Sequence, residues 1–124
     1  MLFSTKKYGS LIIHEIDRTK GFWSKCKALE RRCYWGNQNI EAARFVTRDV
    51  FEKVKGYDEK LNSGDDLNVH KKYMNVARVG FCKNILYHNI GDLNFMQLML
   101  KKFNYGKTSS RYFKKTGENP GRLL

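Results

Sequence analysis

Two adjacent carboxylates, Asp65 and Asp66, follow a Ser-Gly turn in the stretch NSGDDLNVH and precede a predicted helix. Three roles are open to such a pair: capping of the helix, half of a metal site, or a general base aimed into a cleft. Adjacent residues on a helix point in different directions, so the two acids do not automatically clamp one metal ion. Because Ser63 and Asp66 have the Ser-x-x-Asp spacing of a helix start, the spacing alone favours capping.

The histidines offer a second kind of chemistry. His88 follows the strand-like run Ile-Leu-Tyr, and a neutral imidazole at a strand end is a good metal ligand if carboxylates converge on it. A lone histidine is more often simply packed or solvated, so both interpretations stay open. We expect His70 to lie on the solvent side of its helix.

A third candidate is the basic stretch KKFNYGKTSSRYFKK, which interleaves lysine and arginine with tyrosine and phenylalanine. This mixture is typical of a surface for single-stranded nucleic acid and of an interfacial helix on anionic lipid. It is equally typical of a solvated basic face over a packed aromatic stripe. The sequence contains no glycine-rich phosphate loop, zinc-ligand spacing or RNA-binding signature that would decide among them.

The whole chain of 124 residues is strongly basic, with 24 Lys and Arg against 12 Asp and Glu and a formal net charge of +12. Such an excess indicates an anionic partner: nucleic acid, lipid head groups or a phosphorylated substrate. A hydrophobic fraction of 41% argues against a disordered chain. The three cysteines form no Cys-x-x-Cys, and we interpret Cys26, Cys33 and Cys82 as buried structural thiols.

Short strands and helices in mixed order must position these residues. The patterns predict strands at 11–16, 41–46, 78–83 and 85–88, and helices at 21–36, 47–58, 65–77 and 93–103. The first strand has no obvious partner nearby. The first helix carries one apolar stripe that we expect to face the core: Phe22, Cys26, Leu29 and Cys33. The expected fold class is α/β, a mixed short-stranded sheet with packed helices in one domain at 1–115, followed by a flexible tail at 116–124.

In their order and spacing, these segments resemble the second half of inverting glycosyltransferases of family two, which have the GT-A fold. The resemblance runs from about Leu11 to Lys115 and is carried by GFWSKCKALERRCY, then IEAARFVTRDVFEKVKGYDEKLNSGDDLNVHKKY, then VGFCKNILYHNIGDL with the closing YG and RY. In that family, a strand with ARF leads into RDVFEKVGGYDE, GED opens a helix, and a later strand ends in YH. The resemblance therefore implies the C-terminal, acceptor-side half of a GT-A nucleotide-diphospho-sugar transferase domain.

The resemblance also implies roles for individual residues. Asp66 matches the catalytic base, and Asp65 stands beside it where the family usually has Glu. His88 matches a position that in many members helps to hold a divalent metal, Mn or Mg, next to the nucleotide diphosphate. The remaining candidates are basic residues that would meet phosphates of the donor or the acceptor: Arg44 and either Lys107 or Arg111.

Three departures from the family pattern shape the expected function. Lys55 replaces the first glycine of GGYDE, Asn68 replaces the usual second acid, and the sequence has no Asp-x-Asp to ligate the metal. We therefore expect a fragment that lacks the donor-binding half and is inactive alone, with its metal bound only when that half is present. A complementing N-terminal half on another chain would restore transfer, with inversion, from a nucleotide-sugar to a glycan or lipid-linked acceptor.

The alternative is a small basic binding module for an anionic membrane surface or nucleic acid, acting through residues 93–115, with nucleic acid the less favoured partner. On this reading the two acids at 65–66 only cap a helix. No apolar run reaches about 18 residues, and the first residues lack a secretory signal pattern. We therefore expect a cytoplasmic location, peripheral on the inner face of the membrane.

Overall fold

The computed structural model describes residues 8–61 and 64–117. Its elements follow one another as β1 (Ser10–Ile12), β2 (Glu15–Arg18), α1 (Phe22–Cys33), β3 (Phe45–Val46), α2 (Arg48–Lys53), α3 (Asp65–Val76), β4 (Val79–Phe81), β5 (Leu86–Asn89) and α4 (Phe95–Thr116). The mixed α/β class expected from the sequence is confirmed. None of the helices in this part of the chain is long and apolar enough to cross a membrane.

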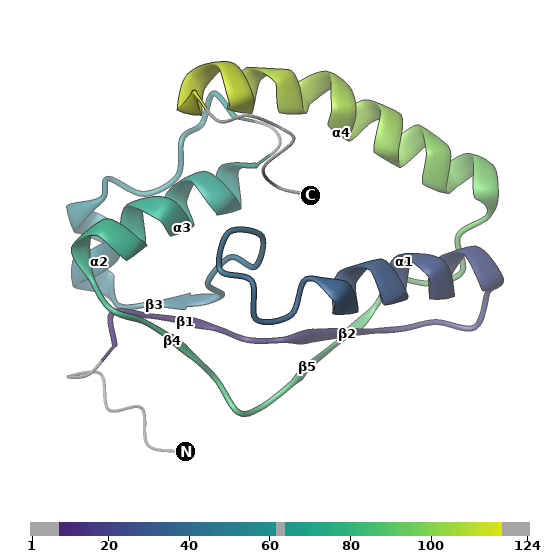
Figure 1. Cartoon of the computed structure of the whole chain (residues 1–124), viewed down its shortest axis with the longest axis horizontal. Helices are drawn as coiled ribbons and strands as arrows, with labels where there is room; N and C mark the ends of the chain where they lie inside the picture. Colours follow the sequence, from purple (N-terminus) through teal and green to yellow (C-terminus); the bar gives the residue numbers. More distant parts are fainter. Residues whose placement is uncertain (1–7, 62–63, 118–124) are drawn as a thin grey trace.

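The strands form two small sheets placed end to end (Figure 1). In the first sheet β1 lies in the middle, antiparallel to β3 and parallel to β4. In the second, β2 pairs in parallel with β5. The predicted strand at 11–16 is thus two strands, interrupted at Ile13 and His14, and its partners come from segments 34 to 71 positions further along the chain.

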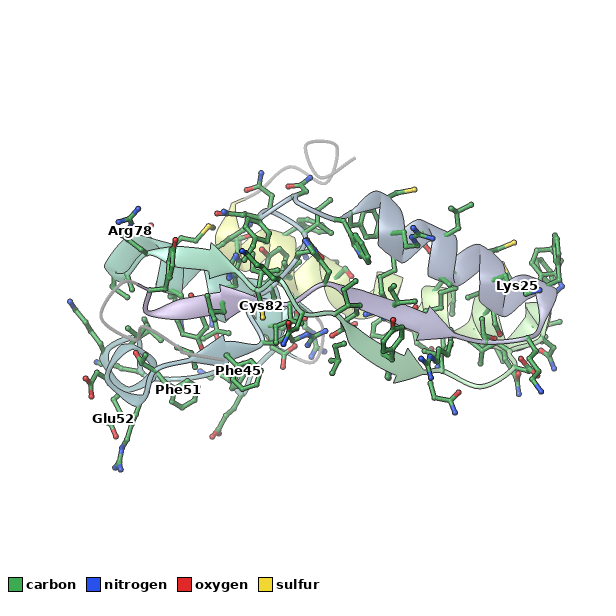
Figure 2. The ribbon with its side chains drawn as sticks, turned by 90° about the horizontal axis from the view of Figure 1, so that it is seen from below. Lys25, Phe45, Phe51, Glu52, Arg78 and Cys82 are labelled. Atoms are coloured by element: carbon green, nitrogen blue, oxygen red, sulfur yellow. The ribbon has the colours of Figure 1, made fainter. Side chains whose placement is uncertain are left out.

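The helices lie on one side of the strands, with α4 as an outer layer that spans the molecule (Figure 1). The opposite side of the strands faces the viewer in Figure 2, and no helix of the described residues covers it. The strands expose four large apolar side chains: Phe45, Phe81, Leu86 and Tyr87.

The main core lies where α2 and α3 meet the first sheet. Val54, Val69 and Tyr73 are its buried members, with Val50 and Phe51 of α2 packed against them. Burial of each such side chain is worth about 1.5–3 kcal/mol relative to exposure. This cluster anchors α3, which carries the acidic pair at its first turn.

Helix α1 packs on β2 with its polar face, not with the predicted apolar stripe. Ser24 is fully buried, whereas the exposed fractions of Phe22 and Leu29 are 69% and 64%. The reason is that β2 presents two buried acids, Glu15 and Asp17, toward this helix. Consequently, the interpretation of the cysteines as buried thiols is wrong for two of them: Cys26 and Cys33 are exposed, and Cys82 is buried.

Helix α3 starts at Asp65, as predicted, and its N-cap residue is Gly64. Gly64 has φ +76°, and a Cβ atom there would lie 2.9 Å from the ring of Tyr112 on α4. Glycine is therefore required both by the left-handed backbone and by the close approach of α4. The predicted Ser-x-x-Asp cap involves Ser63, which lies outside the described residues.

Helix α4 is one continuous helix of 22 residues. It extends beyond the predicted helix at 93–103 and includes the basic stretch that follows. It begins with a reciprocal capping box: the Asn94 side chain accepts from the Gln97 backbone N–H, and the Gln97 side chain accepts from the Asn94 N–H. Gly117, at φ +67°, ends it. Of the predicted tail, Thr116 is still helical, and residues 118–124 lie outside the described part.

Candidate functional site

A cavity of about 460 Å³ lies between α1, the β1–β2 segment, the loop at 40–44, the start of α3 and the inner face of α4. Its walls carry several charged side chains, among them Glu15, Glu41, Arg44 and Asp66. Two of the residues singled out from the sequence, Asp66 and Arg44, are therefore brought to one cavity from positions 22 residues apart.

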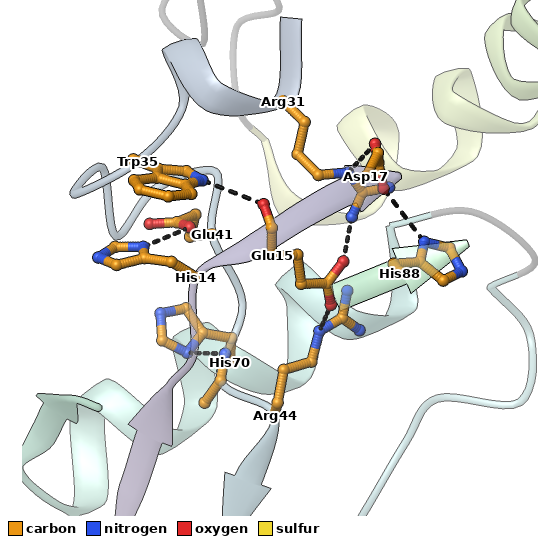
Figure 3. Close-up of polar contacts among 10 residues, drawn as sticks. His14, Glu15, Asp17, Arg31, Trp35, Glu41, Arg44, His70 and His88 are labelled. Atoms are coloured by element: carbon orange, nitrogen blue, oxygen red, sulfur yellow. Dashed lines mark hydrogen bonds and ion pairs between the residues drawn. The ribbon is translucent and has the colours of Figure 1, made fainter. Parts of the chain in front are cut away.

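A chain of ion pairs forms one wall of this cavity (Figure 3). The carboxylate of Glu15 is held between Arg44, whose Nε lies 2.7 Å from Oε1, and the Nη1 of Arg31. Arg31 also reaches Asp17, with Nε 2.9 Å from Oδ2. The side chain of Asp17 is fully buried, and burial of a carboxylate is costly unless a cation pairs with it. Arg44 is thus fixed at the cavity by Glu15, while 44% of its side chain stays exposed.

Asp66 lies in the first turn of α3 and lines the cavity. Its Oδ1 accepts a hydrogen bond of 2.8 Å from the backbone N–H of Leu67. The α3 N-terminus stabilises a negative charge at this position. Asp65, its half-buried neighbour, does not line the cavity, as expected for adjacent residues of a helix.

His70 lies one turn after Asp66 and is fully buried, so the expectation of a solvent-facing side chain is wrong. Its Nδ1 accepts a hydrogen bond of 3.2 Å from the backbone N–H of Ala43. Burial lowers the pKa of His70, outweighing the backbone of Gln38 and the charge of Asp66, which raise it. His70 therefore holds the loop that carries Arg44. In the sequence, the i, i+4 spacing places His70 on the same face of α3 as Asp66, and this spacing could have indicated that His70 faces inward.

A second histidine supports the same loop. His14 stacks on Trp35 with ring centroids 4.7 Å apart, and its Nδ1 lies 2.9 Å from Glu41 Oε1. The other oxygen of Glu41 accepts from the backbone N–H of Gly36 at 2.8 Å. These contacts fix the path of the chain between α1 and β3. In the sequence, His14 had no feature that marked it.

His88 does not line the cavity. Its Nδ1 lies 3.2 Å from Oδ1 of the buried Asp17, and about half of its side chain is exposed. A histidine that ligates a metal usually has its second ring nitrogen bound to a carboxylate in this way, so His88 fits the role of one ligand. However, the described residues contain no group of three or more His, Cys, Asp or Glu side chains that could hold a metal ion.

The basic residues that line the cavity from α4 differ from those expected. Lys107 lies over the Phe103 ring, 4.6 Å from its centroid, and neither Lys107 nor Arg111 lines the cavity. The cavity is instead lined from α4 by Lys101 and Lys102. They follow the buried Leu98 by one helical turn and so share its face, which becomes apparent only once the helix is known to be continuous and packed through Leu98.

Comparison of the chain with protein-family models, with curated proteins and with solved structures finds no match.

Proposed function

We propose that the chain is the acceptor-side part of an inverting glycosyltransferase, with Asp66 as the catalytic base. The observation that carries this proposal is the presence of Asp66 and Arg44 on the same cavity of about 460 Å³. A cavity of this size accommodates a sugar-sized acceptor. The motif resemblance described above agrees with the same two residues.

In this mechanism the Asp66 carboxylate accepts the proton of an acceptor hydroxyl while that oxygen attacks the anomeric carbon of the donor sugar. One carbon–oxygen bond forms, the bond to the nucleotide diphosphate breaks in line, and the anomeric configuration inverts. An alcohol is a poor nucleophile until its proton is accepted, so a positioned carboxylate accelerates this step. Arg44, fixed by Glu15, would bind an oxygen of the acceptor or donor.

We further propose that the donor is bound by a part outside the described residues, on this or another chain. The uncovered strands, with Phe45, Phe81, Leu86 and Tyr87 exposed, support such a part (Figure 2). His88 would contribute one ligand to a divalent metal at that junction. When bound, the metal would neutralise charge on the leaving diphosphate.

To test this proposal, Asp66 is substituted in a protein that also contains the donor-binding part, on the same chain or on a partner chain. We expect Asp66→Asn to lower the transfer rate at least about a hundredfold, because the general base is lost. Asp65→Asn is the matched control, since it removes the same charge one residue outside the cavity. Circular dichroism of both variants checks the fold. Transfer by Asp66→Asn at a rate close to that of the unchanged protein would reject the base assignment.

A specific observation supports a second proposed property, peripheral contact with an anionic membrane. The outward face of α4 exposes Met96, Leu100 and Phe103, with exposed fractions of 64%, 54% and 61%. Lys107 and Lys114 lie on the same face one and three turns further on. An exposed apolar face bordered by lysines is typical of helices that lie in the lipid interface.

Vesicle sedimentation tests this property. We expect the chain to bind vesicles containing phosphatidylglycerol and not vesicles of phosphatidylcholine alone, with binding that weakens as salt is raised. Phe103→Ser should weaken binding more than Thr108→Ser on the inner side of α4. Binding to single-stranded oligonucleotides in preference to vesicles would reject the membrane in favour of nucleic acid.

A further inference from the structure

Three lysines line the cavity from the two helices α1 and α4, and we call this side of the cavity the α1–α4 gap. Lys27 enters from α1, and Lys101 and Lys102 enter from α4. Lys102 is bound by the carboxylate of Glu30. Lys27 and Lys101, by contrast, form no ion pair within the part of the chain that the structure describes.

The surroundings of Lys27 disfavour its positive charge. Burial lowers the pKa of Lys27, and the charges of Lys101 and Arg31 lower it further, while Asp17 and Glu30 act in the opposite direction. A cation that is partly desolvated beside other cations is unfavourable unless an anion approaches it. Glu30 also lines this side of the cavity, but its carboxylate is bound to Lys102. Lys27 and Lys101 are therefore left to bind an anion from outside the chain.

We propose that the α1–α4 gap binds a phosphate monoester or diphosphate group, with Lys27 and Lys101 as its two contacts. Ammonium groups on separate flexible stems are suited to a phosphate, which accepts hydrogen bonds on several oxygens. The phenol of Tyr105, which lines the same cavity, supplies a third donor.

The identity of the ligand rests on the proposed function. Because Lys27 and Lys101 share the cavity with Asp66, the phosphate belongs to the acceptor, whose hydroxyl must reach this carboxylate. The acceptor is therefore a phosphorylated molecule, either a lipid phosphate at the membrane or a soluble phosphate ester. Both share the same recognition chemistry, and the experiment below separates them.

Isothermal titration of the full chain with inorganic pyrophosphate tests the site itself. We expect Lys27→Gln and Lys101→Gln each to weaken binding about tenfold, the loss that one charge-assisted hydrogen bond implies. Lys25→Gln on α1 and Lys107→Gln on α4 remove the same charge outside the cavity, and we expect them to change the affinity less than about twofold. Equal losses in all four variants, or no binding by the unchanged chain, would overturn the proposal.

Vesicles distinguish the two sources of phosphate. Phosphatidic acid carries a phosphate monoester, and phosphatidylglycerol carries a diester. Binding to phosphatidic acid that exceeds binding to phosphatidylglycerol, by an excess that Lys27→Gln removes, supports the lipid source. Pyrophosphate binding that depends on Lys27, without this lipid preference, supports the soluble source.

Failure of this site and failure of the proposed transferase are separable, because pyrophosphate binding requires neither a donor sugar nor proton transfer to Asp66. Retained transfer in Asp66→Asn would leave the phosphate site standing. Unchanged pyrophosphate affinity in Lys27→Gln and Lys101→Gln would reject the site and leave the base assignment standing.

Discussion

Lys102 of α4 donates to both carboxylate oxygens of Glu30 of α1, at 2.6 and 2.7 Å. The pair bridges the gap between the two helices and neutralises one of the lysines that line the cavity there. Its side chains are 48% and 39% exposed, so solvent screens the attraction and the pair contributes little to stability. The main consequence of the pair is therefore electrostatic: Glu30 reduces the positive potential of the gap.

Glu30→Gln should accordingly tighten pyrophosphate binding while changing the free energy of unfolding by less than about 1 kcal/mol. The substitution removes a negative charge beside Lys27 and releases Lys102 to contact the ligand. Titration calorimetry and urea denaturation measure the two quantities. Glu52→Gln, which breaks the exposed pair with Arg48 on α2, is the matched control and should leave the affinity unchanged. Weaker binding in Glu30→Gln would contradict the expected sign.

Arg31→Met should lower the free energy of unfolding by about 2–3 kcal/mol. Removing one partner of a buried ion pair typically costs about 3–5 kcal/mol, and the 30% exposure of Arg31 reduces this. The loss arises because Asp17 and Glu15 lose their shared guanidinium at the buried face of α1.

Arg32→Met is the control for the Arg31 prediction, since it removes the same charge from the next position. Arg32 is exposed and only approaches the Trp35 ring, 5.6 Å from its centroid, so its loss should cost less than about 1 kcal/mol. Chemical denaturation measures both variants. If both substitutions lowered the free energy of unfolding equally, the contacts of Arg44 with Glu15 and of His88 with Asp17 would be sufficient to stabilise the two acids without Arg31.

Asp92→Ala should lower the melting temperature by detaching the loop at 91–94 from the start of α1. The Oδ1 atom of Asp92 accepts from the Thr19 hydroxyl and from the backbone N–H groups of Lys20 and Gly21, at 3.1, 3.0 and 2.8 Å. The α1 N-cap residue, Gly21, has no side chain to provide this acceptor, so Asp92 provides it from a distant part of the chain.

The Asp92 contribution should also depend on pH. The hydrogen bonds from Gly21 and Lys20 lower the pKa of Asp92 below 3.8. A carboxyl with a lowered folded-state pKa stabilises the protein above its unfolded pKa and loses this contribution as pH falls through the folded one. Melting curves of the unchanged chain and Asp92→Ala should therefore converge on strong acidification. A difference that persists in strong acid would assign the effect to packing.

Local sequence patterns were sufficient to predict where two of the helices begin, although neither N-cap residue makes a side-chain capping hydrogen bond. The start of α3 at Asp65 and of α2 after Thr47 followed from turn and capping signals. Apolar residues at helical spacing identified α1 as a helix, and its end at Cys33 lies before the expected Gly36. The structure places Asp66 at the cavity, whereas the spacing alone had favoured a capping role for the acidic pair.

Long-range partners decided the features that the sequence left open or predicted wrongly. The apolar stripe of α1 suggested a buried face, but the acids of β2, Glu15 and Asp17, attract the basic and polar face instead. The α4 residues at the cavity could not be chosen until the helix was known to be continuous and packed through Leu98 and Tyr112. The spacing of residues within one segment predicts neither the orientation of α1 nor the face of α4 that lines the cavity.

His70→Asn should remove a loss of stability that the unchanged chain shows in mild acid. Burial lowers the pKa of His70 below 6.5, so the folded state keeps this side chain neutral while the unfolded chain binds a proton as pH falls through 6.5. The unfolded state then carries more protons, and stability declines from about neutral pH down to the folded pKa of His70. Asparagine keeps an acceptor for the Ala43 N–H and does not titrate.

Urea denaturation at several pH values measures the effect of His70→Asn. All other residues are the same in the two proteins, so the difference between the two pH profiles isolates His70. Parallel profiles would show that the imidazole becomes protonated equally in the folded and unfolded states.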